Sequence, residues 1–111
     1  MIRTVINGIE TNDPLNLQDL FIELDFTKGT VSQQVSINTW EFGLSERKDI
    51  KDAYTVIKDW LKNGVGIFEG VSFQIYIKYR VTEYLLFDGY LDLTTATFDD
   101  NKVKCNSYVS G

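Results

Sequence analysis

Asp88 and Asp92 are the two residues of this sequence whose type and spacing come closest to acid–base chemistry. They lie in the stretch LLFDGYLDLTT, residues 85–95. Positions four apart on a strand share a face and lie about 13 Å apart, whereas paired-carboxylate hydrolases hold their carboxyl groups about 5–10 Å apart. The spacing therefore favours two solvent-facing acids on a strand. A small carboxylate-dependent enzyme, or an enzyme's accessory domain, is a further hypothesis.

Other catalytic and metal-binding patterns are missing from the sequence. It has no histidine, which removes Ser–His and Cys–His nucleophile systems and most zinc sites. The single cysteine, Cys105, is interpreted as a small strand residue and not as a reactive thiol. The glycines of residues 63–70 match no phosphate-binding loop, and residues 98–101 lack the ligand spacing of a calcium loop. We expect no catalytic residue, no metal and no cofactor.

Length and charge indicate one acidic domain. The chain has 111 residues and a net charge of −5, with 16 acids and 11 scattered bases. A length of this order fits one domain, and the lack of a basic stripe disfavours nucleic-acid binding. No apolar run reaches the roughly 20 residues of a membrane helix. The sequence predicts one β-rich domain spanning residues 1–111, either complete or the N-terminal part of a longer chain.

Most of the chain shows the alternation of apolar and polar residues that is typical of half-buried strands. The Asn7-Gly8 pair predicts a hairpin turn within residues 2–10, and residues 99–102 predict another tight turn. In residues 85–93, the odd positions are assigned to the apolar face, so that Leu86 faces outward. The further strands are predicted at residues 19–26, 31–37, 39–44, 65–68, 72–79 and 103–109, with a bulge near Asn38 and a polar connection at 80–83.

One helix is predicted at about residues 49–62. Apolar residues at helical spacing form one stripe along it, and Asp49 or Ser45 can cap its start. The helix should lie across a sheet, with Trp60 as its largest contact. Gly89, on the apolar face of its strand, indicates a bulge or a close approach by this helix or by Trp60.

The expected fold class is α+β and mostly β. Seven to nine short strands with regularly spaced turns predict two packed antiparallel sheets, as a sandwich or barrel, flanked by one helix.

Two parts of the chain resemble phage tail proteins, mostly of phages and prophages of Bacteroidetes-type hosts. The first is INGIETNDPLNLQDLFIELDF, residues 6–26; the second combines GIFEGVSFQIYI, YLLFDGYLDLTT and KVKC, residues 66–77, 84–95 and 102–105. The resemblance implies a virion structural component of the tail or baseplate. It also implies a tail-tube style of domain, in which two sheets flanked by a helix are joined into a ring.

The resemblance makes assembly the expected mechanism. Sheet edges must be covered, and a ring covers them with a heterologous contact that closes. The expected partners are copies of the chain and other tail proteins, in a virion made in the bacterial cytoplasm, with an acidic lumen that does not retain DNA. The alternative is a carbohydrate- or protein-binding β-sandwich module that uses surface aromatic residues. The candidate interface residues are Phe21, Trp40, Tyr76, Leu86, Tyr90 and Tyr108.

Overall fold

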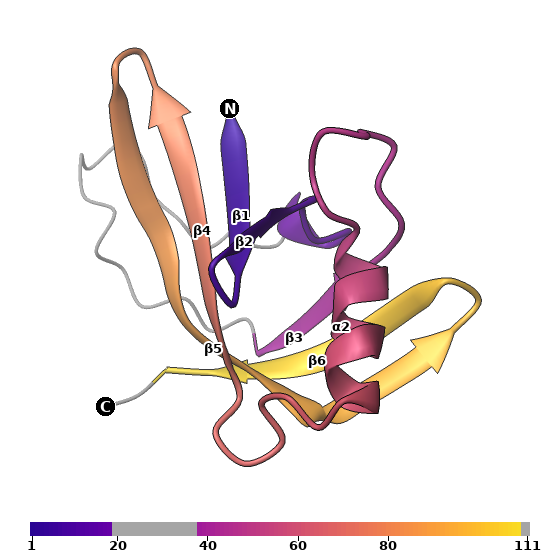
Figure 1. Ribbon diagram of the computed structural model, residues 1–111. Coiled ribbons are helices and arrows are strands. Elements are labelled where there is room, and N and C mark those ends of the chain that lie inside the picture. Colours follow the sequence, from indigo (N-terminus) through magenta and orange to yellow (C-terminus); the bar gives the residue numbers. More distant parts are fainter. Residues whose placement is uncertain (19–37, 110–111) are drawn as a thin grey trace.

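The computed structural model describes residues 1–18 and 38–109. Within them, six strands form one antiparallel sheet in the order β2-β1-β4-β5-β6-β3, and the sheet curls around one side of helix α2 (Figure 1). The elements are β1 (Ile2–Ile6), β2 (Ile9–Thr11), β3 (Thr39–Phe42), α2 (Ala53–Lys62), β4 (Val71–Tyr79), β5 (Thr82–Asp99) and β6 (Lys102–Tyr108). The strands predicted at residues 19–26 and 31–37 lie outside the described residues.

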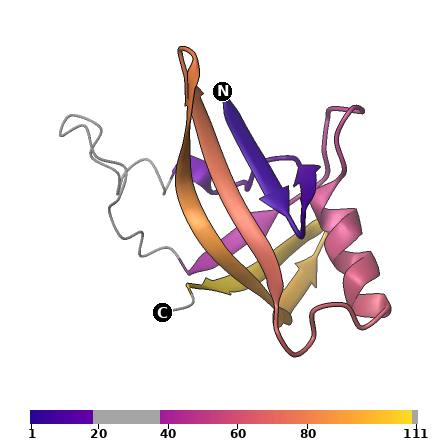
Figure 2. The same ribbon diagram turned by 60° about the vertical axis from the view of Figure 1, so that its left-hand side comes forward.

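The curl of the sheet comes from β5, which has 18 residues and pairs with β4 in its first half and with β6 in its second. The register between β5 and β6 shifts between Asp92 and Thr97. Extra residues on one strand bend it and increase its twist, so β5 turns a corner there (Figure 2). Asp92 accepts hydrogen bonds from the amide and the hydroxyl of Thr94, at 3.1 and 2.6 Å, which stabilise this corner.

The prediction of a mostly β protein with one helix is confirmed. The described strands form one curled sheet, a half-barrel, and the two packed sheets that we expected are not confirmed. The predicted strand at residues 65–68 is wrong, because these residues form turns between α2 and β4.

Both predicted hairpin turns are present, because their signals are local. Asn7 and Gly8 have φ values of 53° and 78°, and Asp100 and Asn101 have values of 49° and 66°. A type I′ turn, whose twist matches the right-handed twist of the flanking strands, requires positive φ at both of its central residues. The connection predicted at residues 80–83 is shorter than expected, since Tyr79 already pairs with Thr82.

The two outermost strands of the sheet are covered by other parts of the same chain. Beside β2, Lys51 forms a parallel bridge with Thr11. Beside β3, the amide of Leu15 donates to the carbonyl of Glu41 at 2.7 Å, and the amide of Glu41 donates to Asn16 Oδ1 at 3.1 Å. The expectation that a neighbouring subunit must cover the sheet edges therefore does not hold for β2 and β3.

Helix α2 begins four residues later than the predicted start at residue 49. The reason is Asn12, a residue of the loop after β2, whose Oδ1 accepts the amide hydrogen of Ala53 at 2.8 Å. Its Nδ2 donates to the carbonyl of Gly43 at 3.2 Å, so one side chain joins the loop, the end of β3 and the helix start. Ala53 and Ile57 are the buried residues of the helix, whereas Trp60, expected to be the main contact, is only partly buried.

Thr4 and Asp13 form a partly buried polar contact in which Thr4 Oγ1 donates to Asp13 Oδ1 at 2.8 Å. Thr4 is fully buried. Burial raises the pKa of Asp13, and the hydrogen bond from Thr4 opposes this shift. The folded state therefore holds the Asp13 proton more tightly than the unfolded state. The contribution to stability is complete below the unfolded pKa of about 3.9 and is lost as the pH rises through the folded pKa.

We predict that Asp13→Asn stabilises the protein at neutral pH, because it removes a partly buried charge and keeps the oxygen that Thr4 requires. The gain in the melting temperature should disappear below about pH 4, where the carboxyl group of the wild type is also neutral. Asp13→Ala is the control, since it leaves the buried Thr4 hydroxyl without its acceptor and should cost about 1–3 kcal/mol. An Asp13→Asn protein less stable than wild type at neutral pH would contradict this prediction.

Cys105 is buried on β6, where it pairs in register with Trp40 of β3. Burial and, secondly, the charge of Asp92 raise the pKa of the Cys105 thiol to about 12. Because the thiolate is the reactive form, we predict that a disulfide reagent does not label the native protein at neutral pH. One thiol per chain should react after unfolding in guanidinium. Labelling of the native protein at the rate of a free cysteine would refute this.

Candidate interaction surface

Asp88 and Asp92 belong to two separate polar contacts. Asp88 is exposed and accepts a hydrogen bond from Gln74 Nε2 at 3.0 Å. Asp92 is partly buried and bonds to Thr94 at the corner of β5. The described contacts do not join the two carboxylates to a common partner. Each carboxylate instead forms a hydrogen bond with a nearby side chain on the surface of the sheet.

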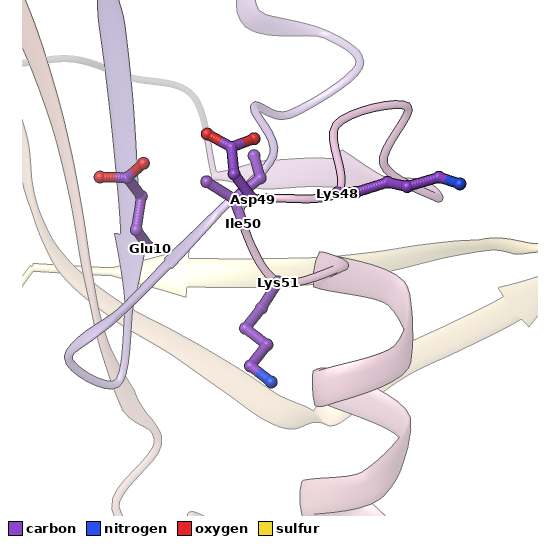
Figure 3. Close-up of a pocket in the computed structure, with 5 residues that line it drawn as sticks. All are labelled: Glu10, Lys48, Asp49, Ile50 and Lys51. Carbon is purple, nitrogen blue, oxygen red and sulfur yellow. The ribbon is translucent and has the colours of Figure 1, made fainter.

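A shallow depression of about 400 Å³ lies between β2 and the segment before α2. Figure 3 shows that the Lys48 and Lys51 side chains extend away from the carboxylates of Glu10 and Asp49. Asp49 is paired with Arg47 at 2.6 Å, and the hydrogen bond from that guanidinium lowers the pKa of Asp49. Within residues 1–18 and 38–109, no group of three or more acidic, His or Cys side chains is placed to hold a metal ion.

Trp40, predicted to be an interface residue, is part of the core. Its exposed fraction is 0%, and its ring packs edge-on against Phe73 and Phe87 at centroid distances of 5.1 and 5.3 Å. Its Nε1 donates to Ser107 Oγ at 2.8 Å. The residues buried with it are Ile6, Phe42, Ala53, Ile57, Val71, Phe73, Ile75, Leu86, Phe87, Leu91, Leu93, Val103 and Cys105.

Leu86 is also buried, and its neighbour Leu85 takes the exposed position that we expected for Leu86. The β4–β5 register shifts after Ile75, so that Phe87 pairs with Ile75 and Leu85 with Tyr76. Leu86 is the extra residue of this bulge and is 4% exposed, whereas Leu85 is 41% exposed. A bulge adds one residue to the strand, so the residues before it face the opposite way from what the alternation after it predicts. The face assigned to Leu85 and Leu86 from the sequence was therefore wrong.

The three tyrosines among the candidate interface residues lie on the outer surface of the sheet. Tyr76 is partly buried beneath the guanidinium of Arg3, which lies 4.4 Å from the ring centroid. Tyr90 and Tyr108 are exposed and stack on each other at 5.4 Å, and the Tyr108 hydroxyl donates to the carbonyl of Glu69. The remaining candidate, Phe21, lies outside the described residues.

Two exposed apolar groups were missed by the sequence analysis. The apolar loop, between α2 and β4, has Val65, Ile67 and Phe68 at its surface, and Phe68 is 98% exposed. The hairpin tip, between β4 and β5, exposes Tyr79 and Val81, the latter to 92%. The sequence analysis placed residues 65–68 and Tyr79 in half-buried strands, so alternation gave no signal that these side chains are exposed. Contiguous exposed apolar residues often mark interaction sites.

One strand edge is also open in the described structure. β5 pairs with β4 along its whole first half, but its pairing with β6 begins only at Tyr90. On its other side, Thr82–Gly89 has no strand partner among the described residues; we call this segment the open edge. It includes the exposed side chains of Tyr84 and Leu85.

The chain matches no protein-family model, no curated protein and no solved structure. Among the described residues, no helix has the length and apolar character needed to cross a membrane.

Proposed function

We propose that this protein is a structural subunit of a phage or prophage tail or baseplate that assembles with copies of itself into a ring or tube. The resemblance of residues 6–26, 66–77, 84–95 and 102–105 to phage tail proteins motivates the virion assignment. The observation that supports self-assembly is the exposure of Phe68 and Val81 at nearly their full surface. Large apolar side chains exposed in this way are stabilised when a partner covers them.

The apolar loop and the hairpin tip lie at opposite ends of β4, which has 9 residues. A strand rises about 3.3 Å per residue, so the two groups are about 30 Å apart. A ring needs two different surfaces on each subunit, because its contacts are heterologous. Two separate apolar groups on one chain fit that requirement.

The test is the oligomeric state of the purified chain. Sedimentation velocity and negative-stain electron microscopy should show a concentration-dependent closed assembly, and Phe68→Asp should weaken it while leaving the circular dichroism spectrum unchanged. Leu44→Asp is a matched control, because Leu44 is also exposed but belongs to neither apolar group. A wild-type chain that is monomeric at high concentration would contradict the proposal. Tail-tube, tape-measure or baseplate genes beside this one would support the virion assignment.

A carbohydrate-binding module is the second candidate, motivated by the exposed Tyr90 and Tyr108 rings. The two rings already stack on each other, which occupies one face of each. A stable monomer that binds glycans in an array, and loses binding in Tyr90→Ala, would favour this function over assembly.

A further inference from the structure

The apolar loop, which leaves the lower end of α2 and enters β4 (Figure 1), is tied by hydrogen bonds at both of its ends. At its start, the amide of Val65 donates to the carbonyl of Trp60 at 2.8 Å, and at its end the amide of Gly70 donates to the carbonyl of Gly66 at 2.9 Å. Gly64, Gly66 and Gly70 have φ values of 74°, 70° and 73°. Glycine adopts such values freely but loses more conformational freedom than other residues when it is fixed. The order of this loop therefore depends on contacts from outside it.

Tyr108, the last residue of β6, provides such a contact. Its hydroxyl donates to the carbonyl of Glu69, the residue that follows Phe68. The Tyr108 ring is itself held in place, because it stacks on Tyr90 with a centroid distance of 5.4 Å and an interplanar angle of 20°. A Cβ added to Gly70 would lie 2.8 Å from the Tyr108 hydroxyl oxygen, so the loop backbone lies directly against this side chain.

We propose that Tyr108 is a positioning residue, which holds the apolar loop so that Phe68 is presented to a second copy of this chain. This role rests on the self-assembly proposed above and specifies what keeps its contact surface in place. Phe68 is 98% exposed, so the loop backbone sets its position and packing of its own ring does not. Ordering a loop during association lowers the affinity of two subunits, and a loop that is ordered beforehand avoids this loss.

Two other roles of Tyr108 must be distinguished from positioning. One is direct contact with a second copy, because the Tyr108 side chain is itself exposed. The other is support of the sheet alone. Tyr108→Phe separates the three roles, since it removes the hydrogen bond to Glu69 and keeps the ring that stacks on Tyr90.

Amide hydrogen exchange of the dilute monomer tests whether Tyr108 holds the loop. In Tyr108→Phe the amide of Gly70 should exchange about two- to tenfold faster, because one hydrogen bond that opposes local opening is lost. The amides of β4 should exchange as in the wild type. Tyr90→Phe is the matched control, because it removes a hydroxyl from the other ring of the stack and keeps the bond to Glu69. An unchanged rate for Gly70, or an equal increase throughout β4, would overturn the proposal.

A double-mutant cycle tests whether Tyr108 acts through Phe68. Sedimentation velocity should show that Tyr108→Phe raises the dissociation constant of the oligomer about two- to tenfold. The same substitution should have a clearly smaller effect in a Phe68→Ala protein, because residues that act through one contact are not additive. An equal increase in both backgrounds would show that Tyr108 contacts the second copy directly, and would overturn the positioning role.

The positioning role and the self-assembly fail in different ways. A loop that exchanges faster in Tyr108→Phe without any change in the dissociation constant would overturn the positioning role and leave self-assembly intact. A wild-type chain without any oligomer would contradict the self-assembly, and with it the contact assigned to Phe68.

Discussion

Replacing Trp40 with alanine should lower the free energy of unfolding by about 3–5 kcal/mol, the range found for large aromatic residues in cores. Trp40 is fully buried and contacts Phe73 and Phe87 edge-on. These three rings come from β3, β4 and β5, which are not all neighbours in the sheet. The indole therefore fills the inside of the curled sheet. Its removal leaves a cavity that can close only if the curvature of the sheet changes.

Urea denaturation followed by far-ultraviolet circular dichroism measures this loss. Trp40→Phe is the matched variant, because it keeps an aromatic ring but lacks the N–H that donates to Ser107. It should cost less, about 1–2 kcal/mol. Trp60→Ala removes the other tryptophan, which is only partly buried, and should also cost less than Trp40→Ala. A larger loss for Trp60→Ala would show that the helix, and not the sheet interior, holds the fold together.

Local signals explain which parts of the fold could be predicted from the sequence. The Asn7-Gly8 and Asp100-Asn101 turns depend on residues that tolerate positive φ, and both were found where expected. The start of α2 was predicted too early, because the residue that binds its first amide, Asn12, comes from a distant loop. A side chain that caps a helix from elsewhere in the chain cannot be predicted from the spacing of apolar residues within the helix.

The candidate surface was predicted less well, for a similar reason. Alternation tells which residues share a face but not where the register of two strands shifts, so Leu86 was assigned to the surface and Leu85 to the core. Alternation also does not tell which face of β3 points inward, and Trp40 was assigned to the interface as an aromatic residue left over after the core is filled. Tyr90 and Tyr108 were expected at the surface and are exposed; their role in an interface stays a prediction.

Gly89→Ala should be the most disruptive small substitution in the sheet. A Cβ at this position would lie 2.6 Å from the carbonyl oxygen of Tyr108 and 3.2 Å from the Phe87 ring. We expected either a bulge at Gly89 or a close approach by α2 or Trp60, and the approaching group is instead the backbone of β6. A carbonyl group in a strand pair cannot move away without shifting the strand, so overpacking should cost about 1–3 kcal/mol or more.

Gly43→Ala is the matched control for this substitution. Gly43 is also buried, but its added Cβ would meet only the flexible end of Leu15, at 3.3 Å. Urea denaturation should therefore show a clearly smaller loss for Gly43→Ala than for Gly89→Ala. Gly89 is also the last residue of the open edge, and β5 begins to pair with β6 at the next residue, Tyr90. If the two substitutions lowered the free energy of unfolding equally, the backbone of β6 would have to move away from Gly89. The position of β6 would then not fix the end of the open edge.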